Sequence, residues 1–265
     1  MALSNVCRMG GMATLVAVLA AAPTVAWADD AADILKAMSQ YLASQENLSL
    51  SFDSDVEVIT PEVQKIQFAS SSQLVMSRPD KIHARRTGGY ADVEIVFDGK
   101  TVTVSGKNVK VTGYVQLDAA GSVDQLVDRL RDAYGIEIPG ADLLASNAYE
   151  VLTSDVISGA HIGRGVIDGV ECEHLAFRGR DTDWQIWVQV GDRPLPRKYV
   201  ITSKAVAGAP EYTVIIKEWK TDERPNANDF VFTPPAGVEK LDLKALHSWD
   251  EIPPETQAMA KGDQK

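Results

Sequence analysis

Strands joined by very short connections recur through most of this 265-residue chain, and no other feature of the sequence restricts the fold as much. Between Leu48 and Val58, apolar residues alternate with polar ones at the two-residue period of a strand with one buried face. Because short connections join neighbouring strands in antiparallel order, the pattern predicts an antiparallel sheet. The other segments with strand character are 63–76, 93–97, 101–104, 161–167, 170–177, 184–190, 198–206 and 212–219.

Two Asp-Gly pairs give the clearest local turn signals. Asp98-Gly99 separates segment 93–97 from 101–104, and Asp168-Gly169 separates 161–167 from 170–177. A two-residue loop of type I′ needs positive φ at both central positions, which Asp-Gly tolerates. Both pairs therefore predict tight hairpins.

Helical patterns occur at the start of the folded part and in its middle. Apolar residues between Ala31 and Leu42 form one helical stripe. Ser122 and Gln125 form a capping box for a helix that Gly135 ends, and a second helical stretch follows Pro139. The predicted order is one helix, six strands, a helical pair, then five or six strands. About eleven antiparallel strands will curl, and the helices are the available filling for the concave side.

The first 28 residues have the pattern of a secretory signal peptide. Arg8 precedes an apolar run over 11–22, and an Ala-x-Ala triplet predicts cleavage between Ala28 and Asp29. The run is shorter than the roughly 20 residues of a membrane span, which disfavours an uncleaved anchor. We therefore expect export to the periplasm, no membrane span in the mature chain, one domain over residues 29–240, and a polar, mobile tail over 241–265.

Composition excludes several function classes. Lys and Arg total 26 against 37 for Asp and Glu, a formal charge of -11, which disfavours a nucleic-acid partner. The two cysteines, Cys7 and Cys172, are too few for a disulfide scaffold or a four-cysteine zinc site. Cys7 lies before the apolar run and not at a cleavage point, so N-terminal lipidation is not predicted.

The sequence carries little recognisable chemistry. It has no P-loop, no G-x-S-x-G, no H-E-x-x-H and no Cys-x-x-Cys. Cys172 and His174 share a strand face, where zinc completed by His161 or His83, or a nucleophilic cysteine, are alternatives to simple packing. A small buried cysteine beside a hydrogen-bonded histidine is favoured. We therefore predict no catalytic residue, no metal and no cofactor, and interpret the basic run Lys81, Arg85 and Arg86 as a solvated strand face.

The apolar strand faces predict a ligand cavity on the concave side. Trp184 shares a strand face with Ile186 and Val188, and the inward set exceeds what two short helices can cover. A fully packed core is the alternative. The cavity candidates are Leu50, Phe52, Phe68, Leu74, Ile95, Phe97, Trp184, Ile186 and Val188 on strands, with Leu126, Leu130, Leu143 and Leu144 on the helical cover.

Five stretches resemble a bacterial family of predicted periplasmic proteins of unknown function, across about residues 31–240. They are 97–101 (FDGKT), 168–177 (DGVECEHLAF), 183–187 (DWQIW), 194–198 (PLPRK) and 232–235 (FTPP). That family is similar to the LolA, LolB and LppX group of lipoprotein and lipid carriers. The resemblance implies an unclosed antiparallel barrel of about eleven strands with helices packed in the concave side, but it transfers no ligand-contact residue.

Together these features predict a non-enzymatic periplasmic binding or carrier protein. Its ligand would be an acyl chain, lipid or lipoprotein-like amphiphile held between the curved sheet and the helical cover, and an envelope protein could be a further partner. The alternative is a structural or interaction module of the cell envelope with a fully packed barrel and no ligand.

Overall fold

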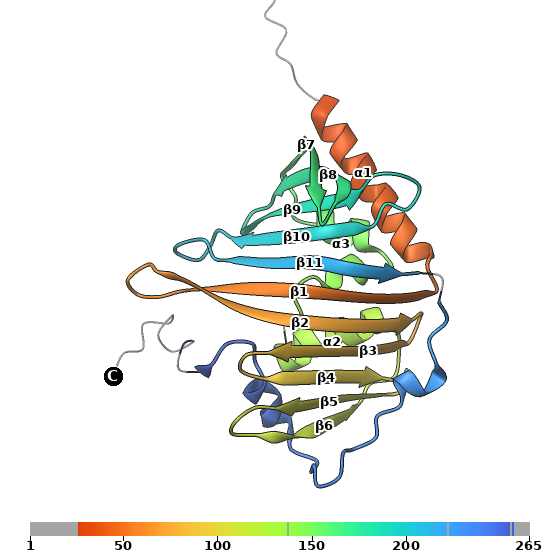
Figure 1. Ribbon diagram of the computed structural model, residues 1–265, viewed down its shortest axis with the longest axis vertical. Coiled ribbons are helices and arrows are strands. Elements are labelled where there is room, and N and C mark those ends of the chain that lie inside the picture. The colour runs from red at the N-terminus through yellow and green to blue at the C-terminus, as the bar shows by residue number, and fades with distance from the viewer. Residues whose placement is uncertain (1–25, 137, 222, 255, 257–265) are drawn as a thin grey trace, which may run out of the picture.

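One antiparallel sheet of eleven strands dominates the structure, a computed structural model that describes residues 26–136, 138–221, 223–254 and 256 (Figure 1). The strand order is β6-β5-β4-β3-β2-β1-β11-β10-β9-β8-β7. The strands are β1 (Asn47–Ile59), β2 (Lys65–Ser77), β3 (Lys81–Gly88), β4 (Asp92–Phe97), β5 (Thr101–Lys107), β6 (Thr112–Asp118), β7 (Ser158–Ile167), β8 (Val170–Arg178), β9 (Thr182–Gln189), β10 (Pro196–Ser203) and β11 (Glu211–Lys220).

The strand order shows two meanders that meet at one central pair. Strands β1 to β6 form the first meander, β7 to β11 form the second, and β1 pairs with β11 at their junction. The order starts at β6 and ends at β7, so the sheet is open. The predicted mainly β fold, an unclosed antiparallel barrel of about eleven strands, is confirmed.

Helical segments pack on the concave side at two places. Helix α1 (Ala26–Ser44) lies against β7, β8 and β9, at the top of Figure 1. Helix α2 (Val123–Tyr134), the 3₁₀ turn η1 (Ala141–Leu144) and helix α3 (Ala148–Thr153) lie behind the sheet in the same view. None of the helices in the described part of the chain is long and apolar enough to span a membrane.

Helix α2 begins and ends where the sequence predicts. The Ser122 hydroxyl accepts a hydrogen bond from the Gln125 backbone N–H, and the Gln125 side chain accepts one from the Ser122 backbone N–H. Gly135 ends the helix with φ of 63°, a conformation that glycine adopts at little cost. These caps fix the position of the apolar stripe formed by Val123, Leu126 and Leu130.

The two Asp-Gly hairpins form, but only one has the predicted turn. Asp168 and Gly169 have φ of 47° and 79° between the paired residues Ile167 and Val170, as type I′ requires. At the other hairpin the turn is closed between Asp98 and Thr101, so its central residues are 99 and 100. The Asp98 carboxylate accepts the backbone N–H groups of residues 100 and 101, and this local bonding shifts the turn by one residue.

The segment after β11 returns to the concave side. In Figure 1 the blue chain passes the β6 edge before it ends near the left ends of the strands. On its way it forms the 3₁₀ turns η2 (Ala227–Phe230) and η3 (Leu243–Ser248). Leu241 packs over Gly113 and Trp249 over Gly106. Trp249 is 3% exposed, so the expected tail over 241–265 packs on the sheet at this residue, while its mobility stays a prediction.

Some predictions fall outside the described residues. The signal peptide over 1–28 lies almost wholly among residues 1–25, which the structure does not describe, and the same holds for 257–265. The predicted cleavage point between Ala28 and Asp29 falls within the first residues of α1.

Candidate functional site

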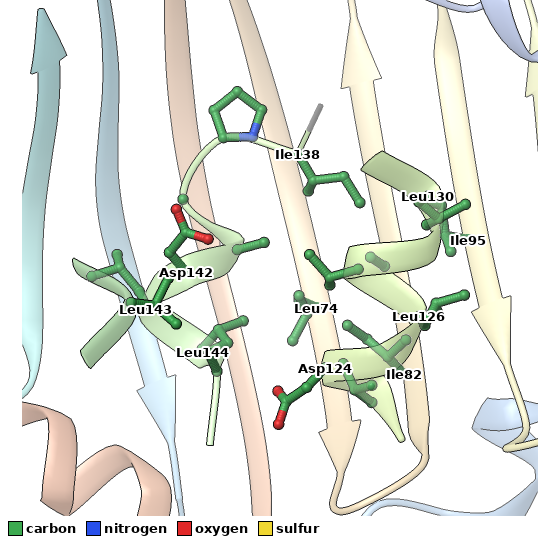
Figure 2. A pocket seen from close by; sticks show the side chains of 18 of the residues that line it. Leu74, Ile82, Ile95, Asp124, Leu126, Leu130, Ile138, Asp142, Leu143 and Leu144 are labelled. Atoms are coloured by element: carbon green, nitrogen blue, oxygen red, sulfur yellow. The ribbon is translucent and has the colours of Figure 1, made fainter. Parts of the chain in front are cut away.

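A cavity of about 240 Å³ separates the sheet from its helical cover (Figure 2). Its floor consists of side chains from β1, β2, β3, β4 and β11, and its cover of side chains from α2, η1 and α3. Most of the lining is aliphatic, with Phe52 and Trp219 as the aromatic members. Such a site can take an apolar group, because few polar side chains reach into it.

Eight of the thirteen predicted cavity residues line this space. The floor residues occupy alternate strand positions and the cover residues lie on α2 and η1, as the periodicity indicates. They are Leu50, Phe52, Leu74, Ile95, Leu126, Leu130, Leu143 and Leu144.

The structure places the predicted group around Trp184 elsewhere. The Trp184 ring stacks on Phe177 with 4.1 Å between centroids, and its edge meets Tyr199 at 5.8 Å. Ile186 and Val188 are buried beside it on β9. Strand β9 contacts α1, so a helix already fills this half of the concave side. Contrary to the expectation from the sequence, Trp184, Ile186 and Val188 do not line this cavity.

Two further candidates also lie outside the cavity. Phe97 is completely buried in the core at the end of β4. Phe68 is half-buried on β2 opposite Val56, beyond the stretch of β2 that faces the cover. Strand alternation assigns a face correctly here, but it gives no position along the strand relative to the helices.

Sequence reasoning missed part of the floor and the polar rim. The β3 segment and the face of β11 that carries Val214 and Ile216 have two-residue alternation, which could have identified them as inward-facing. The acidic and basic residues of α2 and η1 carry no comparable signal. The missed lining residues include Ile82, Ala84, Val214, Ile216 and Trp219 on the floor, Val123, Val127, Ile138 and Val151 on the cover, and Asp124, Asp128, Arg131 and Asp142 at the rim.

Polar contacts fasten the two parts of the cover to each other. Arg131 on α2 donates to the Asp142 carboxylate on η1, with 3.2 Å from Nη2 to Oδ1. The Asp124 carboxylate accepts the Ser146 backbone N–H at 3.2 Å, across the same gap. Figure 2 shows Asp124 and Asp142 on opposite sides of the cavity. Both contacts are made by partly exposed or exposed groups, so breaking them costs little.

A third contact fastens the cover to the sheet. Arg78, at the end of β2, donates from Nη2 to the carbonyl oxygen of Leu144 at 2.7 Å. Burial lowers the pKa of this guanidinium, while the charge of Asp124 opposes the shift. Arg78 therefore lies between η1 and α2 at one end of the cavity.

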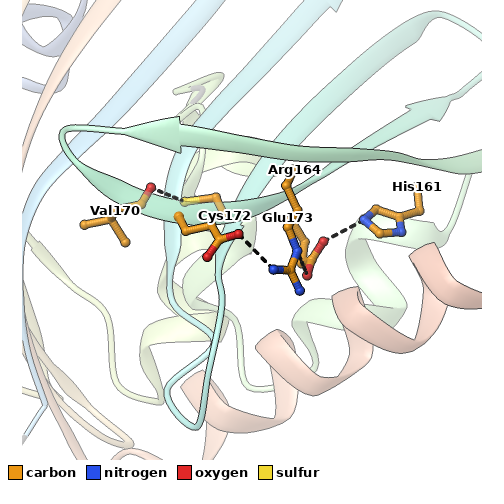
Figure 3. A network of polar contacts seen from close by, with 6 residues as sticks. His161, Arg164, Val170, Cys172 and Glu173 are labelled. Atoms are coloured by element: carbon orange, nitrogen blue, oxygen red, sulfur yellow. Dashed lines mark hydrogen bonds and ion pairs between the residues drawn. The ribbon is translucent and has the colours of Figure 1, made fainter.

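The residues around Cys172 form a separate polar network on β7 and β8 (Figure 3). Glu173 contacts His161 Nε2 at 2.8 Å and Arg164 Nε at 3.1 Å. The Cys172 thiol is fully buried and donates to the Val170 carbonyl at 3.4 Å. Burial raises its pKa, so the thiol stays protonated and is a poor nucleophile.

His174 is held by an aromatic neighbour and an amide. Its ring stacks on Trp187 with 4.0 Å between centroids, and Nε2 lies 3.0 Å from the Gln185 side-chain oxygen. Burial lowers its pKa. Among the described residues, no group of three or more His, Cys, Asp or Glu could hold a metal ion. These contacts support the packing interpretation of Cys172 and His174.

Comparison with known protein families finds one family that matches most of the chain. Residues 31–244 match the family described as predicted periplasmic protein (DUF2092). The chain belongs to this family. The match covers the whole sheet and the helical cover of this DUF2092 protein, and it confirms the resemblance inferred from the sequence. None of the curated proteins compared with it matches significantly.

Solved structures with a similar arrangement share little sequence with this DUF2092 protein. Lipoprotein LppX from Mycobacterium tuberculosis is 11% identical, with a TM-score of 0.46 over 74% of this chain and 98% of that chain. LprF from Mycobacterium bovis is 13% identical, with a TM-score of 0.48 over 76% and 98%. A LolA superfamily protein from Nitrosomonas europaea is 12% identical, with a TM-score of 0.33 over 76% and 96%.

Proposed function

We propose that this protein is a periplasmic binding or carrier protein, not an enzyme, for the acyl chain of a lipid or lipoprotein-like amphiphile. The observation that supports the proposal is the apolar cavity between the sheet and the α2–η1–α3 cover. Burying a methylene group is worth about 0.8 kcal/mol, so even a short stretch of acyl chain would bind measurably there. The family description supports the periplasmic location.

A ligand larger than the cavity needs the cover to open. The cavity volume of about 240 Å³ is smaller than that of most ligand pockets, which is about 300–1,000 Å³. The 3₁₀ turn η1 and the six-residue helix α3 are short, and weak rim contacts join them to α2. Segments of this kind belong to the least stable part of a fold, so ligand entry by movement of the cover is the expected route.

Titration with a fluorescent fatty acid tests the proposal. Saturable binding to the purified mature protein is expected. Ala84→Phe fills the floor of the cavity with an apolar ring, so it should weaken binding while the protein stays folded by circular dichroism. Leu144→Asp should also weaken binding, because it puts a charge on the cover. The matched control is Val109→Asp, at a position 89% exposed and not among the cavity-lining residues.

The competing function is an interaction module of the envelope without a ligand. The small resting volume favours this alternative, and so does the tight packing under α1. Its test is the same titration. Absence of saturable binding, or equal binding by the wild type and Ala84→Phe, would make the interaction module the better account.

A further inference from the structure

The concave face changes from apolar to polar along three neighbouring strands, level on β2 and β3 and one residue pair further on β1. On each strand, the residue that lines the cavity is followed two positions away, on the same face, by a polar residue. The pairs are Phe52 and Ser54 on β1, Leu74 and Ser72 on β2, and Ala84 and Arg86 on β3. Residues two apart on a strand are about 7 Å apart, so the polar residues border the cavity directly.

We call Ser54, Ser70, Ser72, Arg86 and Tyr212 the polar band. The strand register brings its members together, since Ser72 pairs with Arg86 and Ser54 pairs with Ser70. The three serines are buried, and the hydroxyls of Ser54 and Ser70 are 2.9 Å apart. Burial raises the pKa of Tyr212 to about 12, so its phenol keeps its proton at neutral pH. The band therefore offers hydroxyl donors around one guanidinium.

A carboxylate from the C-terminal segment occupies the polar band. Glu251 Oε1 is 3.3 Å from Ser70 Oγ and 3.4 Å from Arg86 Nη1. Arg86 Nη2 donates to the Trp249 carbonyl at 2.8 Å. Arg86 Nε is buried and has no hydrogen-bond partner among the described residues. The band thus already binds one carboxylate, and the Nε–H donor of Arg86 is left without a partner among the described residues.

The position of Arg86 corrects its sequence-based interpretation as part of a solvated strand face. Its neighbour Arg85 points the other way, is 63% exposed and pairs with Glu94. Arg86 is 22% exposed, on the concave side next to an apolar cavity. A cation in such surroundings is costly unless it is paired, and guanidinium groups suit carboxylates because their N–H groups match both oxygens.

We propose that the polar band is a binding site for the carboxylate head group of an amphiphile whose apolar chain lies in the adjacent cavity. Glu251 fills this site when no such ligand is bound. The inference rests on the proposed function, because the cavity must accept the chain.

Exchange of Glu251 for a ligand needs only a short movement. Trp249 anchors the C-terminal segment over Gly106 and is 3% exposed. Glu251 lies two residues beyond this anchor. Burial raises the pKa of its carboxyl group, and the charge of Arg86 opposes this shift. Only the segment beyond Trp249 has to move for a ligand carboxylate to take the place of Glu251.

The test compares a fluorescent fatty acid with the fluorescent fatty alcohol of equal chain length at neutral pH. Glu251→Ala removes the competing carboxylate and should raise the affinity for the acid about tenfold, with the alcohol unchanged within about twofold. Arg86→Met in the Glu251→Ala background should reverse this gain. Using the double variant avoids leaving Glu251 unpaired beside an apolar side chain. Acetate should not compete at millimolar concentration, because the chain supplies most of the affinity.

Matched controls and contrary outcomes separate this inference from the proposed function. Arg85→Met and Glu218→Ala remove the same charges from exposed positions and should leave both affinities unchanged. Equal changes for acid and alcohol in Glu251→Ala would overturn the head-group site while leaving the cavity proposal intact. Binding of neither probe to any variant would overturn both proposals. Tight binding of acetate would show a site for free carboxylates instead of an amphiphile.

Discussion

Arg131 on α2 and Asp142 on η1 form an ion pair that bridges the two parts of the cavity cover, with 3.2 Å between Nη2 and Oδ1. Each side chain is 38% exposed, so the pair is solvated and adds little to global stability. Because the pair lies at the rim of the cavity, we expect it to restrain the cover.

Asp142→Asn should therefore loosen the cover without unfolding the sheet. We expect faster hydrogen exchange in peptides covering 123–153, faster association of a fluorescent fatty acid, and a loss of unfolding free energy below about 1 kcal/mol. Asp132→Asn, at an exposed position on the same helix, is the control. Unchanged exchange in this region for Asp142→Asn would show that the pair does not restrain the cover.

Trp184 is predicted to stabilise the fold and not to contact ligand. Trp184→Ala removes a ring packed between Phe177 and Tyr199, which should cost about 3–5 kcal/mol in urea unfolding. Trp187→Ala, on the opposite and more exposed face of the same strand, should cost less. The milder Trp184→Phe should leave the affinity for the fatty acid unchanged. A large loss of affinity in this variant would show that Trp184 contacts the ligand.

Most of the fold could be predicted from the sequence because its signals are local. The two-residue alternation of β1, the Asp168-Gly169 turn and the caps of α2 each depend on residues close in the chain. Short connections then leave an antiparallel order as the natural topology. The hairpin at Asp98 shows the limit of these local signals. Hydrogen bonds to the Asp98 carboxylate place its turn one residue later than predicted.

The site could be predicted only in part, because it depends on contacts between distant segments. Periodicity put Leu74 and Trp184 on inward faces, and both face inward. It could not tell that α1 covers Trp184 while α2 and η1 leave space above Leu74. Nor could it place Trp249 and Glu251 against Gly106 and Arg86, more than a hundred residues away in the sequence.

The pH dependence of stability should include a term from Glu57. Its carboxylate accepts hydrogen bonds from Lys65 Nζ at 2.8 Å and from the Glu211 backbone N–H at 3.0 Å. Burial raises the pKa of this group, but these bonds outweigh burial and hold the pKa below its ordinary value. The folded state therefore binds the proton less tightly than the unfolded state, and this stabilisation is complete above the unfolded pKa of about 4.3.

As the pH falls through the lowered pKa of folded Glu57, that stabilisation should be lost. The difference in unfolding free energy between the wild type and Glu57→Gln should therefore be constant near neutral pH and shrink in acid. Denaturant unfolding at several pH values measures it. Glu62→Gln, at an exposed position in the β1–β2 turn, is the matched control. A difference that grows in acid would contradict the assigned sign.

Processing of the exported protein tests the predicted signal peptide. Cleavage after Ala28 should give a mature N-terminus at Asp29, because the Ala-x-Ala triplet ends a short apolar run. Mass spectrometry of protein recovered from the periplasm measures it. An intact Met1, or a lipid attached to a cysteine, would contradict the prediction.

Gly106 and Trp249 should be energetically coupled, because the indole ring occupies the space where a side chain at 106 would lie. Gly106→Ala would push Trp249 from its buried position and should be strongly destabilising, whereas Trp249→Ala should cost about 3–5 kcal/mol. In the Trp249→Ala background the glycine substitution should cost almost nothing, since the obstacle is gone. Denaturant unfolding of the wild type, the two single variants and the double variant gives the coupling energy, which should exceed about 1 kcal/mol.

Gly89→Ala, where an added methyl group would meet nothing within 4 Å, is the control. Additive effects of the two substitutions would mean that the C-terminal segment is not held on the sheet by this contact.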